Sequence, residues 1–361
     1  FPMRDDVATY PHQSELRQYF RDYAAHFGLY EHYEFSTRVV QVTPKGDIWT
    51  LVTEKDGVRQ ERYVAGVLIA NGTLHHPLMP ELPGYDGELI HAAQYKRPDQ
   101  FWGKRVLVVG CGNSACDIAV DAVHHANKVD ISVRRGYYFV PKFVFGKPAD
   151  TLGGLRLPRV MKQFLDGLMI RAFMGRPSDY GLPDPDYKLY ESHPVVNSLV
   201  LYHLGHGDIH ARGAIARADG KTITFANGYS ANYDMVLMAT GYSLHYPFID
   251  RDLLNWQGAA PRLYLNCMHP KSDSLFVMGM VEATGLGWQG RDEQAEMVAL
   301  YLRQIINGKH SARRLKQRKA RHYMEASNGG YQYLKLDRMA YYVNKDEYRS
   351  AVRKHINELR S

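Results

Sequence analysis

The chain has 361 residues, which is too long for one ordinary hydrophobic core, so its length predicts two domains. Hydrophobic residues make up 45% of the chain and charged residues 23%, a balance that excludes a disordered protein. The net charge of +7 equals the seven lysines and arginines of the acid-free stretch 309–321, which favours a solvated helix face there over a patch for nucleic acid or a membrane surface.

Cysteine content and the absence of targeting signals indicate where the protein works. Three cysteines without a Cys-x-x-Cys pair cannot form a disulfide framework, so a reducing cytoplasm is the expected location. No apolar run is long enough to span a membrane, and no secretory signal opens the chain. Histidines 203, 206 and 210 lie close together, but no carboxylate or cysteine completes a ligand set, so we expect no metal site.

The first hundred residues predict a helix followed by strands. Apolar residues recur at helical spacing over 12–28, and Gly28 is a natural stop. Three strand-like runs follow, at 34–42, 47–54 and 58–64. The pair Asp56-Gly57 is typical of a hairpin turn. A short apolar strand then ends at Gly72, and a proline-rich loop follows it.

The same order of elements recurs after residue 207. Strand-like runs, one of them ending in an Asp219-Gly220 turn, lead to an apolar strand that ends at Thr240-Gly241. A strand, a glycine turn and a helix precede this second copy at 105–123, whereas nothing similar precedes the first copy. We therefore expect an α/β fold with two Rossmann-like domains, the first of which lacks its first βαβ unit in this chain.

The glycine turn has the pattern G-x-G-x-x-A and lies between an apolar strand and a helix. It reads Gly110, Cys111, Gly112, Asn113, Ser114 and Ala115. The first glycine permits the tight turn, the second permits close approach of a pyrophosphate, and Ala115 permits close packing of helix on strand. Backbone N–H groups at the start of the helix face the phosphates. The turn therefore predicts dinucleotide binding.

The end of the next strand distinguishes between dinucleotides. NAD and FAD require an acidic residue there, but this chain has Arg134 and Arg135. A guanidinium suits a 2′-phosphate, so the sequence favours NADP. We expect Arg134 to be the phosphate ligand, although one of the two arginines can equally be a surface residue.

Four motifs in order resemble the flavin-containing monooxygenase family over residues 1 to about 308. The most specific one is an aromatic-x-G-x-x-x-H-x-x-x-aromatic signature, with Tyr85, Gly87, His91 and Tyr95. The others are the glycine turn, the "SVRRG" that follows it and the later "LMATGY". The family's first G-x-G-x-x-G, which holds FAD, and its active-site asparagine are absent from these residues, so no catalytic residue is assigned.

The resemblance implies FAD and NADP as cofactors. In this family NADPH reduces FAD, the reduced flavin forms a hydroperoxide with O2, and one oxygen passes to an amine nitrogen or a sulfur. Baeyer–Villiger oxidation of ketones is the variant chemistry. A non-catalytic NADP-binding module is the alternative of another class, if the FAD half is truly absent. The expected partners are a small molecule and O2, with no nucleic acid, and a homo-oligomer stays open.

The resemblance also implies roles for residues of the NADP half. The positions at the pyrophosphate turn and the 2′-phosphate are Gly110, Gly112, Asn113, Ser114, Ala115, Asp117, Arg134 and Arg135. Thr240 and Gly241 lie at the carboxyl end of a strand, where ligands bind in such sheets. Simple strand-end turns explain Gly72 and Gly241 equally well. His91 resembles a linker residue that braces two domains rather than a catalyst.

For FAD, the resemblance implies that Val39 offers backbone to the adenine and that Gly72 lies near the flavin. Gln289 and Gln294 are implied contacts of the flavin ring, with ordinary polarity of a helix start as the alternative. The implied division is an incomplete FAD domain at 1–98, an NADP domain at 99–245, a return to the FAD domain at 246–308 and a basic helical tail at 309–361.

A helical insertion is expected within the NADP domain, at about 140–205. Its helix over 158–175 is amphipathic, with one apolar face that we expect to point inward. The residues of this face are Val160, Met161, Phe164, Leu165, Leu168 and Met169. We favour a lid over the substrate side, although such a helix can also touch a membrane.

Overall fold

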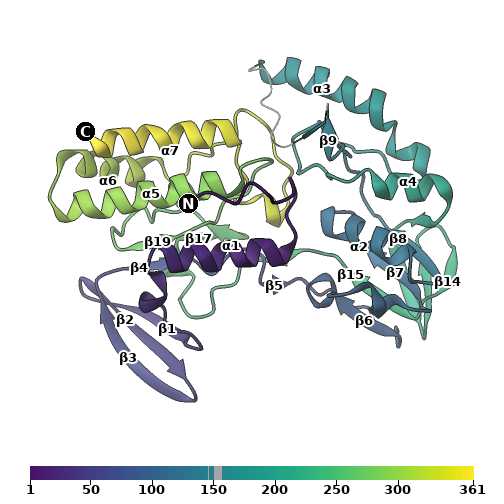
Figure 1. Ribbon diagram of the computed structural model, residues 1–361, viewed down its shortest axis with the longest axis horizontal. Helices are drawn as coiled ribbons and strands as arrows, with labels where there is room; N and C mark the ends of the chain where they lie inside the picture. Colours follow the sequence, from purple (N-terminus) through teal and green to yellow (C-terminus); the bar gives the residue numbers. More distant parts are fainter. Residues whose placement is uncertain (145, 150–156) are drawn as a thin grey trace. The chain divides into compact units, whose positions relative to one another are not determined.

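The computed structural model describes residues 1–144, 146–149 and 157–361 (Figure 1). These residues form two compact units. Unit 1 consists of residues 1–66 together with 247–250, and unit 2 consists of residues 67–246 and 251–361. The glycine turn and both arginines after the next strand belong to unit 2.

Unit 1 contains a helix and a three-stranded antiparallel sheet in the order β1-β2-β3. The elements are α1 (Gln13–His26), β1 (Arg38–Lys45), β2 (Ile48–Lys55) and β3 (Val58–Val64). The predicted helix, the three strands and the turn at Asp56-Gly57 are confirmed. The backbone N–H of Val42 donates to the carbonyl of Phe248 at 2.6 Å, which joins the sheet to residues 247–250.

Unit 2 is built on a five-stranded parallel sheet in the order β11-β8-β7-β15-β6. Its strands are β6 (Glu88–His91), β7 (Arg105–Val109), β8 (Lys128–Ser132), β11 (Ile209–Arg212) and β15 (Met235–Met238). The helices α2 (Asn113–Val123) and α4 (Leu199–His206) bury apolar side chains against it. The predicted strand, glycine turn and helix are therefore β7, the turn and α2.

An antiparallel meander packs on the sheet through a separate apolar cluster. Its strands are β12 (Ile215–Asp219), β13 (Thr222–Phe225) and β14 (Ser230–Asn232). The predicted repeat is confirmed, because each meander is followed by a short strand in parallel pairing. β4 (Val67–Ile69) follows the first meander and pairs with β19 (Leu275–Val277), and β15 follows the second and pairs with β7.

The proline-rich segment after Gly72 contains two strands that the sequence did not indicate. β5 (His76–Pro77) pairs with β16 (Tyr242–Ser243), and β6 forms one edge of the five-stranded sheet. Both strands are too short to show a period in the sequence.

Three helices form a second core in unit 2 and lie side by side in green to yellow in Figure 1. They are α5 (Gly287–Ile306), α6 (His310–His322) and α7 (Lys345–Arg360). The acid-free stretch 309–321 forms α6, and one face of α6 is buried. Lys319 is only 1% exposed, and its Nζ donates to the carbonyls of His269 and Ser272, each at 2.6 Å.

The expected insertion lies partly outside the described residues, which omit 145 and 150–156. The described part contains β9 (Phe143–Val144), β10 (Lys147–Pro148) and α3 (Arg159–Met174). Two further short strands are β17 (Trp256–Gln257) and β18 (Ala260–Pro261). Short 3-10 turns lie at Leu29–His32, Ala92–Gln94, Pro98–Phe101, Pro177–Tyr180, Asp252–Leu254 and Asp337–Met339.

Candidate functional site

The glycine turn between β7 and α2 has the geometry that a phosphate-binding turn needs. Gly110 has φ 123°, and a Cβ atom there would lie 2.6 Å from the carbonyl oxygen of Ala239, so only glycine fits. A Cβ atom at Gly112 would meet nothing within 4 Å, so open space lies beside this glycine. Ala115 is fully buried and packs the helix on the sheet. The turn therefore suits a bound pyrophosphate.

The polar residues of the first two turns of α2 separate into two groups. The side chain of Asn113 accepts the N–H of Val196 at 2.7 Å, and Asp117 accepts the side-chain amide of Asn197 at 2.7 Å. These two residues hold the segment before α4 against α2. Ser114 is exposed. Of the polar residues predicted at the turn, Ser114 is therefore the one whose side chain is not engaged by the segment before α4.

The two arginines after β8 have different surroundings. Arg134 is exposed and makes no hydrogen bond or ion pair with any described residue. Arg135 is half-buried, and its Nε is buried without a hydrogen-bond partner. A Cβ atom at Gly136 would lie 2.2 Å from the carbonyl carbon of Asp184, so glycine is required where the chain leaves the sheet. This close backbone contact fixes the path of the chain directly after both guanidinium-bearing residues.

His91 holds the end of β15. Its Nδ1 accepts the N–H of Ala93 at 3.0 Å, and its Nε2 lies 3.1 Å from the carbonyl oxygen of Gly241, so this network assigns the proton to Nε2. Burial lowers the pKa of His91, which keeps the ring neutral. The side chain of Thr240 also donates to the carbonyl of Leu78. Thr240 and Gly241 are thereby clamped at the carboxyl edge of the sheet.

The remaining signature residues also act in the scaffold. The ring of Tyr85 lies over Gly87, where a Cβ atom would be 2.3 Å from the tyrosine hydroxyl. Tyr95 stacks on Phe101 with ring centroids 5.0 Å apart, and its hydroxyl donates to Asp121 on α2. Burial raises the pKa of both tyrosines, so neither ionises near neutral pH. The signature forms the edge strand β6 and secures it to α2.

The predicted FAD contacts are placed very differently. Gly72 follows β4 in unit 2, whereas Val39 lies in β1 of unit 1, beside a register shift. Gln289 is exposed on α5. Gln294 is fully buried, its Oε1 accepts the N–H of Gly279 at 2.7 Å, and its Nε2 donates to the Tyr348 hydroxyl at 2.7 Å. Gln294 therefore has a structural role, and in this arrangement it has no surface left to contact a flavin.

A polar network beside the β4–β19 pair was not indicated by the sequence. The Thr73 hydroxyl donates to Glu282 at 3.4 Å, and Arg291 on α5 lies 3.3 Å from the same carboxylate oxygen. Burial raises the pKa of Glu282 above its ordinary value. Tyr342 accepts the N–H of Thr284 at 3.1 Å. These side chains come from three distant segments, so no spacing in the sequence could reveal them.

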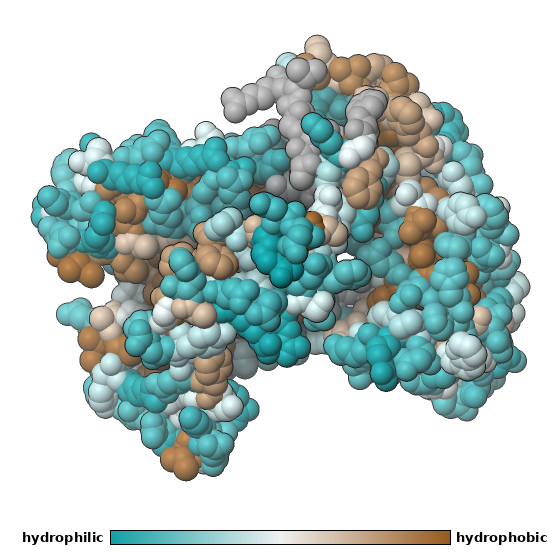
Figure 2. Space-filling model, in the orientation of Figure 1, coloured by the Kyte–Doolittle hydropathy of each residue, from teal (hydrophilic) through white to brown (hydrophobic). Residues whose placement is uncertain are grey.

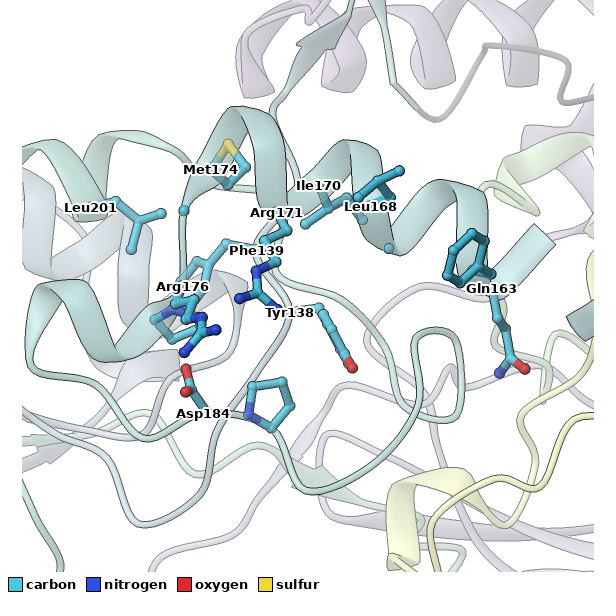
Figure 3. A pocket seen from close by; sticks show the side chains of 15 residues that line it. Tyr138, Phe139, Gln163, Leu168, Ile170, Arg171, Met174, Arg176, Asp184 and Leu201 are labelled. Carbon is cyan, nitrogen blue, oxygen red and sulfur yellow. The ribbon is translucent and has the colours of Figure 1, made fainter. Parts of the chain in front are cut away.

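A cavity of about 460 Å³ lies under α3 (Figure 3). Tyr138, Phe139 and Leu201 line it together with the charged side chains of Arg171 and Asp184. None of the residues of α3 is buried, and Figure 2 shows apolar side chains gathered on the surface over this helix. The expectation that its apolar face is buried is therefore wrong, although Phe164 and Leu168 also line the cavity. The exposed members are Val160, Met161, Phe164, Leu165, Leu168 and Met169.

Two features are absent from the part of the chain that the structure describes. No group of three or more histidine, cysteine, aspartate or glutamate side chains there could hold a metal ion. In the same residues, no helix is long and apolar enough to cross a membrane.

The chain is similar to several known proteins. The family model described as "flavin-binding monooxygenase-like" matches residues 1–358. Dimethylaniline monooxygenase (N-oxide-forming) 2 of Pan troglodytes is 30% identical over 322 residues, which is 82% of this chain and 59% of that protein. The chain spans less than two thirds of the length of this relative.

Two solved structures show the same α/β fold. S-allyl-L-cysteine S-oxygenase from Allium sativum has a TM-score of 0.62 at 17% identity, with 99% of this chain and 70% of that chain covered. Cyclohexanone monooxygenase bound to ε-caprolactone has a TM-score of 0.71 at 17% identity, with 96% and 83% covered. The family model covers nearly the whole chain, and the protein belongs to the flavin-binding monooxygenase-like family.

Proposed function

We propose that the protein is an NADPH- and FAD-dependent monooxygenase that transfers one oxygen atom of O2 to an amine nitrogen or a sulfur. The observation that carries the proposal is the glycine turn at Gly110 and Gly112, with the unpaired Arg134 at the end of the next strand. A free guanidinium at that place suits the 2′-phosphate of NADP. Membership of a flavin-binding family implies FAD as the second cofactor.

The residues present fit NADP and one edge of an FAD site, and their tasks are binding and positioning. Backbone N–H groups at the start of α2 would hold the pyrophosphate of NADP, and Arg134 would hold its 2′-phosphate. Gly72 and Gly279 follow the parallel strands β4 and β19, where added Cβ atoms would meet nothing within 4 Å, so this edge offers open backbone to FAD. When bound, FAD supplies the chemistry with O2.

The proposed net reaction balances without a protein nucleophile. NADPH, a proton and O2 react with the substrate to give the oxygenated product, NADP⁺ and water. The cofactors supply the reactive groups for oxygen transfer. The protein must therefore position the cofactors and the substrate and exclude water, and it does not need an acid–base pair of its own. A neutral His91 that holds Gly241 fits this division of tasks.

We extend the proposal to the organisation of the chain. The NADP-binding domain would comprise residues 99–245, the FAD-binding domain residues 1–98 and 246–308, and the C-terminal helical part residues 309–361. Support comes from the five-stranded sheet, because four of its strands, β7, β8, β11 and β15, lie within 99–245, whereas the edge strand β6 lies just before residue 99. The insertion that contains α3 would cover the substrate side, because the cavity under α3 lies beside the segment that follows β8.

Nitrogen and sulfur substrates are favoured over ketones by the names of the relatives. The Pan troglodytes relative is named as N-oxide-forming and the Allium sativum protein as an S-oxygenase. Ketone oxidation is the second candidate, because the cyclohexanone monooxygenase fold is also similar. A non-catalytic NADP-binding module is the alternative of another class.

Substrate-dependent oxidation of NADPH by the full-length protein tests the proposal. We expect consumption of NADPH and O2 to yield the N-oxide of N,N-dimethylaniline or the sulfoxide of methyl phenyl sulfide. Conversion of cyclohexanone alone to ε-caprolactone would favour the ketone reaction. Binding of NADP⁺ without oxidation of NADPH in the presence of any of these compounds would favour the binding module.

A further inference from the structure

Two arginines from distant parts of unit 2 face the same tyrosine. The guanidinium carbon of Arg135 lies 5.9 Å from the ring centroid of Tyr137, and that of Arg338 lies 5.8 Å from the same centroid. Arg338 also donates to the Ser192 hydroxyl at 2.9 Å. Both arginines lower the pKa of Tyr187, although burial outweighs them and raises it to about 12. We refer to Arg135, Arg338, Tyr137, Tyr187 and Ser192 as the two-arginine cluster.

Neither arginine of the two-arginine cluster forms an ion pair with a described carboxylate. Three other arginines of unit 2 with partly buried side chains bind carboxylates, in the pairs Arg105–Asp234 at 2.8 Å, Arg212–Asp130 at 2.8 Å and Arg349–Glu293 at 2.7 Å. Neither Arg135 nor Arg338 has a carboxylate within 4.0 Å among the described residues. The Nε of Arg135 is buried without a hydrogen-bond partner.

An unpaired charge that is partly removed from water is costly, and so is a second like charge beside it. His193 lies next to Ser192 in the chain, and its pKa is lowered to about 4 by burial and by Arg338, so it is neutral and adds no charge. The cluster therefore carries two positive charges with unused donors. Such a site is complementary to an oxyanion.

The two-arginine cluster lies close to the glycine turn. Arg338 binds Ser192, and four residues further along the same segment Val196 binds Asn113 in the first turn of α2. Four residues span at most about 14 Å even when extended. The segment is held by backbone hydrogen bonds of 2.8 Å between Val195 and both Tyr138 and Val140. The cluster and the predicted pyrophosphate turn thus lie at the same edge of the sheet.

We propose that Arg338, from the C-terminal segment, acts together with Arg135 to bind a phosphate group of NADP. The inference rests on the proposed function and extends it, because Arg338 lies more than 200 residues from the strand that precedes Arg135. The phosphate is either the 2′-phosphate or the pyrophosphate, since both are oxyanions that guanidinium groups recognise. The NADP site would then be completed by a segment outside the five-stranded sheet.

Calorimetric titration of the full-length protein with NADP⁺ and NAD⁺ tests the proposed role of Arg338 in phosphate binding. A charge-assisted hydrogen bond contributes about 1.5–3 kcal/mol, so Arg338→Ala should weaken NADP⁺ binding by about tenfold to 150-fold. If Arg338→Ala lowers the affinity for NADP⁺ alone, Arg338 binds the 2′-phosphate. If it lowers the affinities for NADP⁺ and NAD⁺ equally, Arg338 binds the pyrophosphate. The matched control is Lys335→Ala, which removes an exposed positive charge three residues away and should leave both affinities unchanged.

Thermal unfolding without nucleotide separates a ligand contact from a structural role. Arg338→Met removes the unpaired charge and keeps the length of the side chain, so the melting temperature should stay the same or rise while NADP⁺ affinity falls. A lower melting temperature with unchanged NADP⁺ affinity would overturn the inference, as would an equal loss of affinity in Lys335→Ala. If the wild-type protein binds no NADP⁺, the proposed function itself is refuted.

Discussion

The half-buried His193 and the buried His269 make the stability of the protein depend on pH. Burial lowers the pKa of His193 and of His269 to about 4, and Arg338 and Lys319 respectively strengthen the shift. An unfolded histidine titrates near 6.5. Between these values the unfolded chain binds protons that the folded chain does not. The stability from these groups is therefore present above about pH 6.5 and is lost as the pH falls toward 4.

Replacement of His193 by Gln should reduce this loss. The full pKa shift of one histidine corresponds to about 3 kcal/mol. When the pH is lowered from 7 to 4.5, the free energy of unfolding should fall in both proteins. The fall should be about 2–3 kcal/mol smaller in His193→Gln than in the wild type. Urea unfolding at both pH values measures the difference. His206→Gln is the matched control, because His206 is exposed. The same loss in His193→Gln and the wild type would show that His193 is already charged when folded.

Gly136 should be one of the least replaceable residues near the predicted cofactor site. A Cβ atom there would lie 2.2 Å from the carbonyl carbon of Asp184 and 2.4 Å from the nitrogen of Pro185. Backbone must move to relieve this contact, so Gly136→Ala should lower the free energy of unfolding by about 3 kcal/mol or more. In the control Gly167→Ala, within α3, a Cβ atom meets nothing within 4 Å, and stability should stay equal or rise. Equal stabilities of both variants would contradict the close backbone contact.

At the scale of elements, α6 shows how a basic stretch can be both solvated and anchored. Lys319 and Lys316 both pair with Asp273, but Lys319 has 1% of its side chain exposed and Lys316 has 55%. Removal of one partner from a buried pair costs far more than removal of an exposed one. The basic composition of 309–321 therefore combines a solvated face with one buried ionic contact.

Lys319 and Lys316 allow a matched test of how α6 packs. Lys319→Ala should lower the free energy of unfolding by about 3 kcal/mol, since it also leaves the carbonyls of His269 and Ser272 without a donor. Lys316→Ala should change it by less than about 1 kcal/mol. Chemical denaturation of both variants measures the difference. Similar effects of the two substitutions would indicate that α6 does not pack as described.

The elements that the sequence predicted well are those with a clear period or a turn signal. The α1 helix, the hairpin at Asp56-Gly57 and the unit β7–turn–α2 belong to this group. The strand β6 was missed because four residues show no period, and its place depends on pairing with β15. The apolar face of α3 was placed inward because a helical period shows that one face is apolar and not what covers it.

At the scale of the whole molecule, the repeat of a meander followed by a parallel strand was the most informative sequence feature. It predicted the α/β fold, because each copy implies a dinucleotide-binding sheet. The surroundings of the site could not be predicted. Arg338, Ser192 and Glu282 come from segments that meet only in the folded chain, and Gln294 resembles any polar helix residue until its partners are known.

Isotope labelling is the most direct test of the proposal that the protein is a monooxygenase. The full-length protein is supplied with NADPH, ¹⁸O₂ and N,N-dimethylaniline or methyl phenyl sulfide, and the mass of the product is measured by mass spectrometry. We expect one ¹⁸O atom in each N-oxide or sulfoxide, with one NADPH oxidised per product. Oxidation of NADPH that yields only hydrogen peroxide, or a product whose oxygen comes from water, would contradict the proposed oxygen transfer.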